Sequence, residues 1–210
     1  MKQIKFSICT ASLFMLMSCV DLNLNPLSEG SSENWYSSQA EIEMSLNDFY
    51  RTDFFPIDDM KWGDDVTARN ETSAVNNGTL TSEDGTIAKR WENYYKGIAR
   101  ALRIINNMDR ARAMGVSERD IAQYEGEAYF YLGYAYGMLA FHWGDAILDK
   151  VGMSLDEAYT ASRSPKADVL AYSYECLDKA AERLPNSYPG IQRATKGAAY
   201  ACLLYTSDAA

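Results

Sequence analysis

A polar segment spanning residues 56–85 holds most of the side chains in this sequence that could do chemistry. It contains two adjacent carboxylate pairs, Asp58/Asp59 and Asp64/Asp65. Calcium-binding loops alternate their oxygen ligands along the chain, and this spacing is absent here. A glycosidase needs two carboxyl groups facing each other across a cleft, which sequence neighbours on one loop do not supply. The pairs therefore favour a solvated acidic loop.

The same segment offers side chains that could line a binding site. Long loops in compact domains are usually functional or disordered. Binding sites combine aromatic rings with a few well-placed polar groups. A competing interpretation packs the tryptophan on a helical core and leaves the other side chains in solvent. The candidate lining residues are Trp62, Asp64, Asp65, Arg69, Asn70, Asn76 and Asn77.

The sequence contains no catalytic or metal-binding constellation. Its one histidine, His142, lies between Phe141 and Trp143 in an apolar helix end, where a packed side chain is expected. One histidine without a cysteine pair argues against a zinc site. A Gly-rich phosphate loop and a serine nucleophile elbow are both absent. We therefore expect no metal, no cofactor and no enzymatic activity.

The N-terminus has the features of a lipoprotein export signal. Lys2 and Lys5 precede an apolar run, Phe6–Met17, that is too short to span a bilayer as a helix. The run ends in Leu16-Met17-Ser18-Cys19, the pattern in which the cysteine thiol receives a diacylglycerol. This predicts a signal peptide over residues 1–18 and a lipid anchor on Cys19 that holds the protein on a membrane without crossing it. In the alternative, an ordinary signal, Cys19 is incidental.

The charge balance excludes two kinds of partner. The formal net charge is −9, and removal of the signal with Lys2 and Lys5 takes it to −11. An acidic chain argues against nucleic acid, which is bound through Lys and Arg, and against an electrostatic grip on an anionic membrane. Only Cys176 and Cys202 remain after the anchor, each within a helical pattern, so a disulfide framework is not expected.

Helices must position the polar segment. After an Asn- and Pro-bearing tether over residues 19–36, capping signals and apolar residues spaced three or four apart predict an all-α domain over residues 37–202. Pro56 should end the first helix or follow its end closely, and Ser164 should cap the fourth, with Pro165 at its first position. The predicted helices start at Ser38, run over Thr86–Ala113, Ser117–Phe141 and Ser164–Leu184, and start again near Thr195, with a short helix at Ser154–Ala161.

Small residues predict close helix pairing. Gly126, Gly133 and Gly137 are costly inside a helix and make sense where neighbouring helices approach closely. The pattern at residues 126–132 recurs weakly at 197–203, an offset close to two tetratricopeptide periods of roughly 34 residues. The chain stops within a helical pattern, so we expect residues 203–210 to be a non-native tail on a C-terminally truncated chain with one apolar face exposed.

Several segments, taken in order, resemble the SusD/RagB family of nutrient-binding lipoproteins. Each motif is weak alone, but their order covers nearly the whole mature chain. Leu132 and Ile147 depart from the Arg and Pro that the family often has there. The matching segments are the lipoprotein start with its tether to Pro26, Trp62-Gly63-Asp64-Asp65, Trp91/Tyr94/Tyr95/Ile98 with Arg100 and Asn106, Glu127-Ala128-Tyr129-Phe130 with Tyr134, Tyr136, Leu139 and Trp143-Gly144-Asp145, Arg163–Lys166, Leu177–Ala180 with Leu184-Pro185, and Arg193–Ala199.

The resemblance implies a fold, a location and a ligand class. Family members are all-helical around tetratricopeptide-like helix pairs, sit on the outer face of the outer membrane over a TonB-dependent SusC-like transporter, and capture glycans or, in some branches, peptides. Trp62 would then stack on a sugar ring, with the polar loop residues bonding its hydroxyls. Family chains are much longer, and their C-terminal part supplies much of the ligand surface. The alternatives are a tetratricopeptide-type adaptor for protein partners, a peptide-binding RagB-like receptor and, last, a hydrolase.

Overall fold

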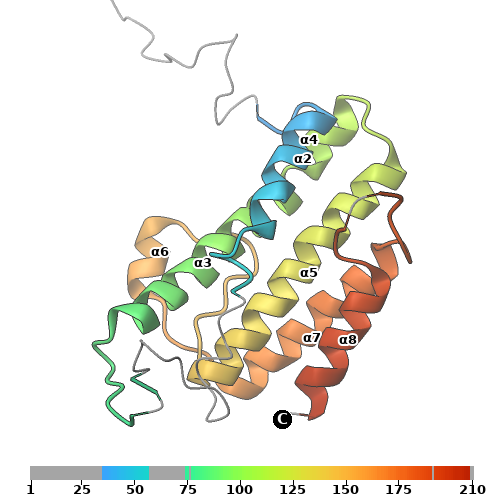
Figure 1. Ribbon diagram of the computed structural model, residues 1–210. Coiled ribbons are helices and arrows are strands. Elements are labelled where there is room, and N and C mark those ends of the chain that lie inside the picture. Colours follow the sequence, from blue (N-terminus) through green and yellow to red (C-terminus); the bar gives the residue numbers. More distant parts are fainter. Residues whose placement is uncertain (1–34, 57–73, 76, 191, 209–210) are drawn as a thin grey trace, which may run out of the picture. The chain divides into compact units, whose positions relative to one another are not determined.

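The computed structural model describes residues 35–56, 74–75, 77–190 and 192–208, with side chains up to residue 204. The chain divides into two units, Met1–Trp35 and Tyr36–Ala210, and everything below concerns the second. Its described residues form helices and one isolated antiparallel bridge between Ala146 and Ser164, which confirms the all-α prediction. The helices are α2 (Gln39–Asn47), the 3-10 helix η2 (Asp48–Tyr50), α3 (Gly85–Asn106), α4 (Met108–Ala113), α5 (Glu118–Trp143), α6 (Leu155–Thr160), α7 (Lys166–Arg183) and α8 (Lys196–Asp208) (Figure 1).

The first described helix starts where the capping box predicted. The Ser38 hydroxyl accepts a bond from the Glu41 amide, and the Glu41 carboxylate accepts the Ser38 amide in return. The apolar spacing placed Ile42, Leu46, Phe49 and Tyr50 on one face; the first three are buried, whereas Tyr50 is 40% exposed. The helix ends before Pro56. Helix α2 stops at Asn47, and η2 leads directly into extended backbone at Arg51.

The helix predicted over Thr86–Ala113 is divided into two helices, α3 and α4. The helical conformation is interrupted at Asn107, whose backbone leaves the helical region and whose side-chain amide donates to the Arg103 carbonyl at 2.7 Å. An asparagine side chain that bonds a helical carbonyl competes with the backbone hydrogen bonds of the helix. The helix therefore ends here, although the apolar spacing in the sequence continues past this point. Gly115, with φ +88°, follows the end of α4 as predicted.

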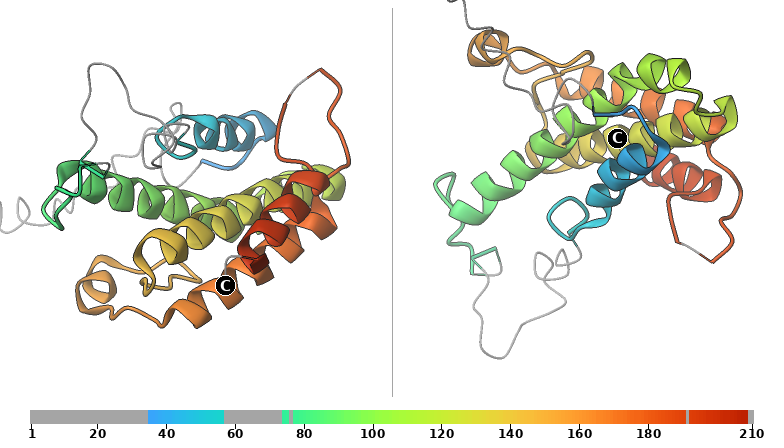
Figure 2. Two further views of the ribbon diagram at one scale, coloured as in Figure 1. Left: turned by 60° about the horizontal axis from the view of Figure 1, so that its bottom comes forward. Right: turned by 90° about the horizontal axis from the view of Figure 1, so that it is seen from above.

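Helices α5 and α7 form the central antiparallel pair (Figures 1 and 2). Gly133 lets them touch: a Cβ there would lie 2.5 Å from Leu177 Cγ and 3.0 Å from the Ser173 carbonyl. The Ser173 hydroxyl donates to the Gly133 carbonyl at 2.7 Å in the same buried contact. A Cβ at Gly126 would lie 3.0 Å from Arg183 Cβ and 3.1 Å from Leu184 Cγ, so the predicted close approach is confirmed at these two glycines.

The start of α7 corrects one prediction. Ser164 does not cap the helix; it pairs with Ala146 in the isolated bridge, and Pro165 is the capping residue without a side-chain bond. The carboxylate of Asp145 performs the capping by accepting the Lys166 amide at 2.9 Å. The residue that satisfies the helix start therefore comes from 21 positions upstream.

Helix α8 packs antiparallel on α7 and completes a second helix pair (Figure 2). One buried apolar cluster joins the three helices α5, α7 and α8. It includes Phe130 of α5, Leu177 of α7, Leu184 at the end of α7, and Ala199 of α8. Cys176 is fully buried, as the sequence predicted, whereas Cys202 is partly buried, and neither forms a disulfide among the described residues. The described part of the chain thus stacks helix pairs in the tetratricopeptide manner.

Candidate functional site

The predicted binding residues fall mostly outside the described residues. This holds for Trp62, Asp64, Asp65, Arg69, Asn70 and Asn76, and also for Cys19. Asn77 is described, and it stands exposed in a turn in which the Thr79 amide bonds the Ala74 carbonyl at 2.9 Å. Gly78 takes φ +65° in this turn, a conformation that glycine adopts readily.

A pocket of about 390 Å³ lies where the polar segment leaves and rejoins the helical body. One wall comes from the turn after η2 and the other from the first three turns of α3. This volume lies within the range of small-molecule sites. The lining residues are Thr52, Asp53, Pro56, Gly85, Thr86, Lys89, Arg90 and Asn93.

The start of α3 is held so that one of its faces lines this pocket. The Asp84 carboxylate caps the helix by accepting the Thr86 and Ile87 amides at 2.8 and 3.4 Å. Thr86, Lys89, Arg90 and Asn93 follow at spacings of three and four residues, so they lie on one side of α3. Reasoning from sequence missed them because it followed only the apolar stripe of this helix, although the polar spacing was equally visible.

The pocket wall offers hydrogen-bonding and charged groups. Lys89 contacts Glu92 at 3.3 Å, and Asp53 contacts Arg51 at 3.3 Å, so both charges are already balanced by neighbours. Hydroxyl, amide, ammonium and carboxylate groups in such a wall can bond a polyhydroxylated ligand. The described lining contains no histidine or cysteine.

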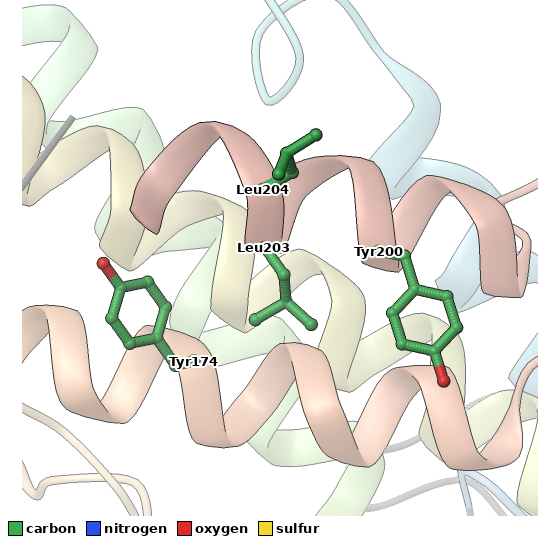
Figure 3. A pocket seen from close by; sticks show the side chains of 4 residues that line it. All are labelled: Tyr174, Tyr200, Leu203 and Leu204. Carbon is green, nitrogen blue, oxygen red and sulfur yellow. The ribbon is translucent and has the colours of Figure 1, made fainter. Parts of the chain in front are cut away.

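A second hollow, of about 430 Å³, lies between α7 and α8. Leu203 points toward α7 between Tyr174 and Tyr200, whereas Leu204 points away (Figure 3). Tyr200 is 55% exposed and Leu204 62%, which confirms the expected exposed apolar face at this end of the described chain. The only polar side-chain groups in this lining are two tyrosine hydroxyls at opposite ends, so it does not resemble a sugar site.

A buried charged cluster ties three distant segments together. Glu127 of α5 is 2% exposed and accepts bonds from Arg193 Nη1 at 2.7 Å and from the Tyr50 hydroxyl at 2.9 Å. The Tyr50 oxygen in turn accepts the Ala194 amide at 2.9 Å, and Arg193 also bonds Asn47. Sequence reasoning placed Glu127 and Arg193 in family-like motifs without expecting them to meet.

The electrostatics of this cluster explain its protonation states. Burial raises the pKa of Tyr50, and the negative charge of Glu127 raises it further, so the phenol stays protonated and donates. Burial opposes the charge on Arg193, but the Glu127 carboxylate more than offsets this and holds the pKa of Arg193 above its ordinary value. Glu127 is buried, and the Tyr50 hydroxyl and the Arg193 guanidinium both bond to its carboxylate, so the cluster is a structural clamp.

The connection after α5 is held by a second set of polar contacts. The Tyr95 hydroxyl bonds both the carbonyl and the amide of Ile147, at 3.0 and 2.8 Å, and burial raises the pKa of Tyr95 to about 12. In the same way, the Tyr136 hydroxyl donates to the backbone carbonyl of Asp149 and accepts from the backbone amide of Asp149. The family-like tyrosines of α3 and α5 therefore fix the path of the chain beyond Gly144.

No group of three or more His, Cys, Asp or Glu side chains among the described residues could hold a metal ion. Nor does any described helix combine the length and apolar character needed to cross a membrane. The His142 ring packs edge-on against Phe141 and Trp143, as expected for a core histidine.

The described residues form an all-α protein of stacked helix pairs, with a polar pocket between the turn after η2 and the start of α3. The family model for SusD-like proteins, described as starch-binding and associating with the outer membrane, matches residues 29–205. The chain belongs to this SusD-like family, which confirms the resemblance found in its motifs.

Individual relatives agree with this family. SusD-like protein P2 of Formosa agariphila is 24% identical over 195 residues, covering 83% of this chain and 37% of the relative. A SusD-like crystal structure from Bacteroides fragilis superposes with a TM-score of 0.71 at 23% identity, over 84% of this chain and 36% of the other. A SusD superfamily structure from Bacteroides vulgatus gives 0.70 at 23% identity, over 83% and 41%. The chain thus spans about two fifths of the length of these relatives.

Proposed function

We propose that the full-length protein is an outer-membrane surface lipoprotein that binds glycans, does not transform them, and delivers them to a SusC-like TonB-dependent transporter. The observation that carries the proposal is the polar pocket between the turn after η2 and the start of α3, on a chain of the SusD-like family. One similar solved structure, at 18% identity and a TM-score of 0.64, was determined with a xylogluco-oligosaccharide. That ligand class supports the assignment of an oligosaccharide here.

The chemistry of the pocket suits a sugar better than a peptide. Sugars present hydroxyl groups that are both donors and acceptors, and the lining supplies both kinds from Thr52, Thr86 and Asn93. A peptide of unrestricted sequence calls for apolar side-chain subsites, and the lining includes only Pro56 as an apolar residue with a side chain beyond Cβ. In this proposal Trp62 supplies the flat ring for stacking, and Asp64, Asp65, Arg69, Asn70, Asn76 and Asn77 supply further polar contacts.

Trp62→Ala should weaken glycan binding of the full-length protein about tenfold, equivalent to about 1.4 kcal/mol, because buried aromatic anchors dominate such contacts. Asn93→Ala should weaken it several-fold by removing one amide from the pocket wall. Affinity gel electrophoresis against a panel of neutral and acidic polysaccharides, followed by titration calorimetry on the retained one, measures both effects.

The matched control is Met114→Ala, which trims an exposed side chain far along the chain from the pocket residues. Its binding should equal that of the parent protein. Retention of peptides and of no polysaccharide would reject the glycan assignment in favour of a RagB-like peptide receptor. Release of free sugar from a bound polysaccharide would show that the protein is a hydrolase.

The anchor gives a separate prediction for localisation. Cys19→Ala should abolish incorporation of radiolabelled palmitate and move the full-length protein from the outer-membrane fraction to the periplasmic or secreted fraction, because a protein without acyl chains has no hydrophobic hold on the bilayer. Cys9→Ala lies inside the signal and should change neither result. Unaltered labelling in Cys19→Ala would disprove the assignment of the anchor to this residue.

A further inference from the structure

Tyr131 of α5 contacts the elements that form both walls of the polar pocket. The first wall is the turn at residues 52–56, called the wall turn here, and the second is the start of α3. Helix α3 packs on α5 (Figure 2). Arg90 and Asn93 line the second wall, and Gly97 follows Asn93 by four residues, on the same side of α3. Tyr131 itself is fully buried, so any effect that it has on the pocket passes through these elements.

The Tyr131 ring packs against the aromatic residues that carry the wall turn. Phe54 and Phe55 meet the ring at nearly right angles, with centroid distances of 5.9 and 5.4 Å. Phe49 of η2 stacks on its face at 4.8 Å, with an interplanar angle of 7°. The amides of Phe54 and Phe55 both donate to the Arg51 carbonyl at 3.0 Å, which closes the turn. The position of the wall turn therefore depends on where the Tyr131 ring lies.

The hydroxyl end of Tyr131 lies against the helix of the second wall. A Cβ added at Gly97 would lie 2.2 Å from Tyr131 Oη and 2.3 and 2.4 Å from its Cε1 and Cζ. Only glycine leaves the ring enough room to approach the backbone of α3 this closely. Glycine inside a helix costs about 1 kcal/mol relative to alanine. The close approach of Tyr131 is the physical reason for a glycine at this position.

Hydrogen bonding does not explain why residue 131 is a tyrosine. The Tyr131 hydroxyl is buried and has no hydrogen-bond partner within the described part of the chain. A buried hydroxyl without a partner typically costs about 1–3 kcal/mol. Phenylalanine would avoid that cost and keep the same ring contacts. The hydroxyl instead adds length, which extends the side chain from the wall turn to the backbone of α3.

We propose that Tyr131 is a positioning residue for the pocket, a spacer whose ring and hydroxyl set the separation of the wall turn from α3. The inference rests on the proposed function, because it gives Tyr131 an effect on glycan binding. Groups that bind a ligand must be held within about 0.5 Å of their productive positions by the residues that support them. Three aromatic rings pack against Tyr131, so the walls and not the spacer move when its length changes.

Tyr131→Phe in the full-length protein separates positioning from stability. The variant loses only a hydroxyl that has no described partner, so its melting temperature should equal or exceed that of the parent protein. Its affinity for oligosaccharides should nevertheless fall about threefold, because the walls close on the space that the oxygen leaves. Native gels containing starch, xyloglucan or pectin select the polysaccharide, and titration calorimetry with its oligosaccharides measures the affinity.

Gly97→Ala should change the same separation in the opposite direction. The added methyl group has to displace Tyr131 or the backbone of α3, and the affinity should fall about tenfold or more. Gly133→Ala is the matched control, because it also adds a methyl group to a tight contact of α5 but faces α7 and not α3. It should cost stability and leave the affinity of the folded protein unchanged. If Gly97→Ala fails to fold, Tyr131→Phe decides the matter alone.

Amide hydrogen exchange in the wall turn gives a second measurement that needs no glycan. Well below the lowest melting temperature, the Phe54 and Phe55 amides should exchange several-fold faster in Tyr131→Phe and in Gly97→Ala, but not in Gly133→Ala, because local opening follows the loss of local packing. Unchanged exchange in the first two variants would overturn the spacer.

The remaining outcomes are also decisive. Faster exchange with unchanged affinity would show that the separation of the walls does not affect binding, which overturns the proposal. An equal loss of affinity in Gly133→Ala would assign the effect to general instability, with the same consequence. If the parent protein binds none of the three polysaccharides, the proposed function loses its support, and the exchange measurement still decides whether Tyr131 sets the positions of the walls.

Discussion

Arg193→Met should destabilise the protein by about 3 kcal/mol, the largest single effect expected outside the apolar core. The substitution leaves the Glu127 carboxylate buried, with its side chain 1% exposed, and without the cation that balances it. Removing one partner of a buried ion pair typically costs about 3–5 kcal/mol. The lower end applies here because Tyr50 and Gln123 still donate to Glu127.

Urea unfolding followed by circular dichroism measures this effect, and two variants test its cause. Arg112→Met removes an arginine that contacts three carboxylates, Asp109, Glu118 and Glu125, with its side chain 36% exposed. Solvent-exposed pairs contribute only about 0–1 kcal/mol, so this variant should lose little. Glu127→Leu combined with Arg193→Met should recover most of the stability, because no buried charge remains. A loss below about 1 kcal/mol in Arg193→Met alone would show that the cluster is not a clamp.

Gly133→Ala should destabilise the protein by about 2 kcal/mol, although alanine is the better helix former by about 1 kcal/mol. The added methyl group would lie 2.5 Å from Leu177 Cγ and 3.0 Å from the Ser173 carbonyl oxygen. A side chain can move aside, but the backbone of α7 cannot do so without shifting the whole helix. Overpacking a tight contact typically costs about 1–3 kcal/mol, and the shift would also weaken the Ser173–Gly133 hydrogen bond.

Gly197→Ala is the matched control for this contact. It makes the same substitution within α8, where the nearest atom to a new Cβ is Thr195 Oγ1 at 3.8 Å. Helix propensity then dominates, and the variant should be as stable as the parent protein or up to about 1 kcal/mol more stable. In a double-mutant cycle, Leu177→Ala should relieve part of the cost of Gly133→Ala. Additive losses would mean that Leu177 is not the obstructing group.

The sequence by itself determined the parts of the fold that depend on neighbouring residues. Ser38, Ser117 and Ser154 begin helices because a side-chain oxygen two or three residues before an amide can cap it in any context. Apolar spacing of three and four residues set which side of α5 and α7 is buried, since that spacing reflects helix geometry alone. The small residues at Gly126 and Gly133 correctly marked the tight helix crossings.

Only the tertiary structure decided the features that join residues far apart in the chain. The cap of α7 comes from Asp145, 21 residues before Lys166. Ser164 does not cap the helix, because its backbone pairs with Ala146 in the bridge. Glu127 meets Arg193 across 66 residues. The pocket wall combines the turn at residues 52–56 with α3. Local patterns carry no information about such contacts, because the free energy that selects them arises only when separate helices pack.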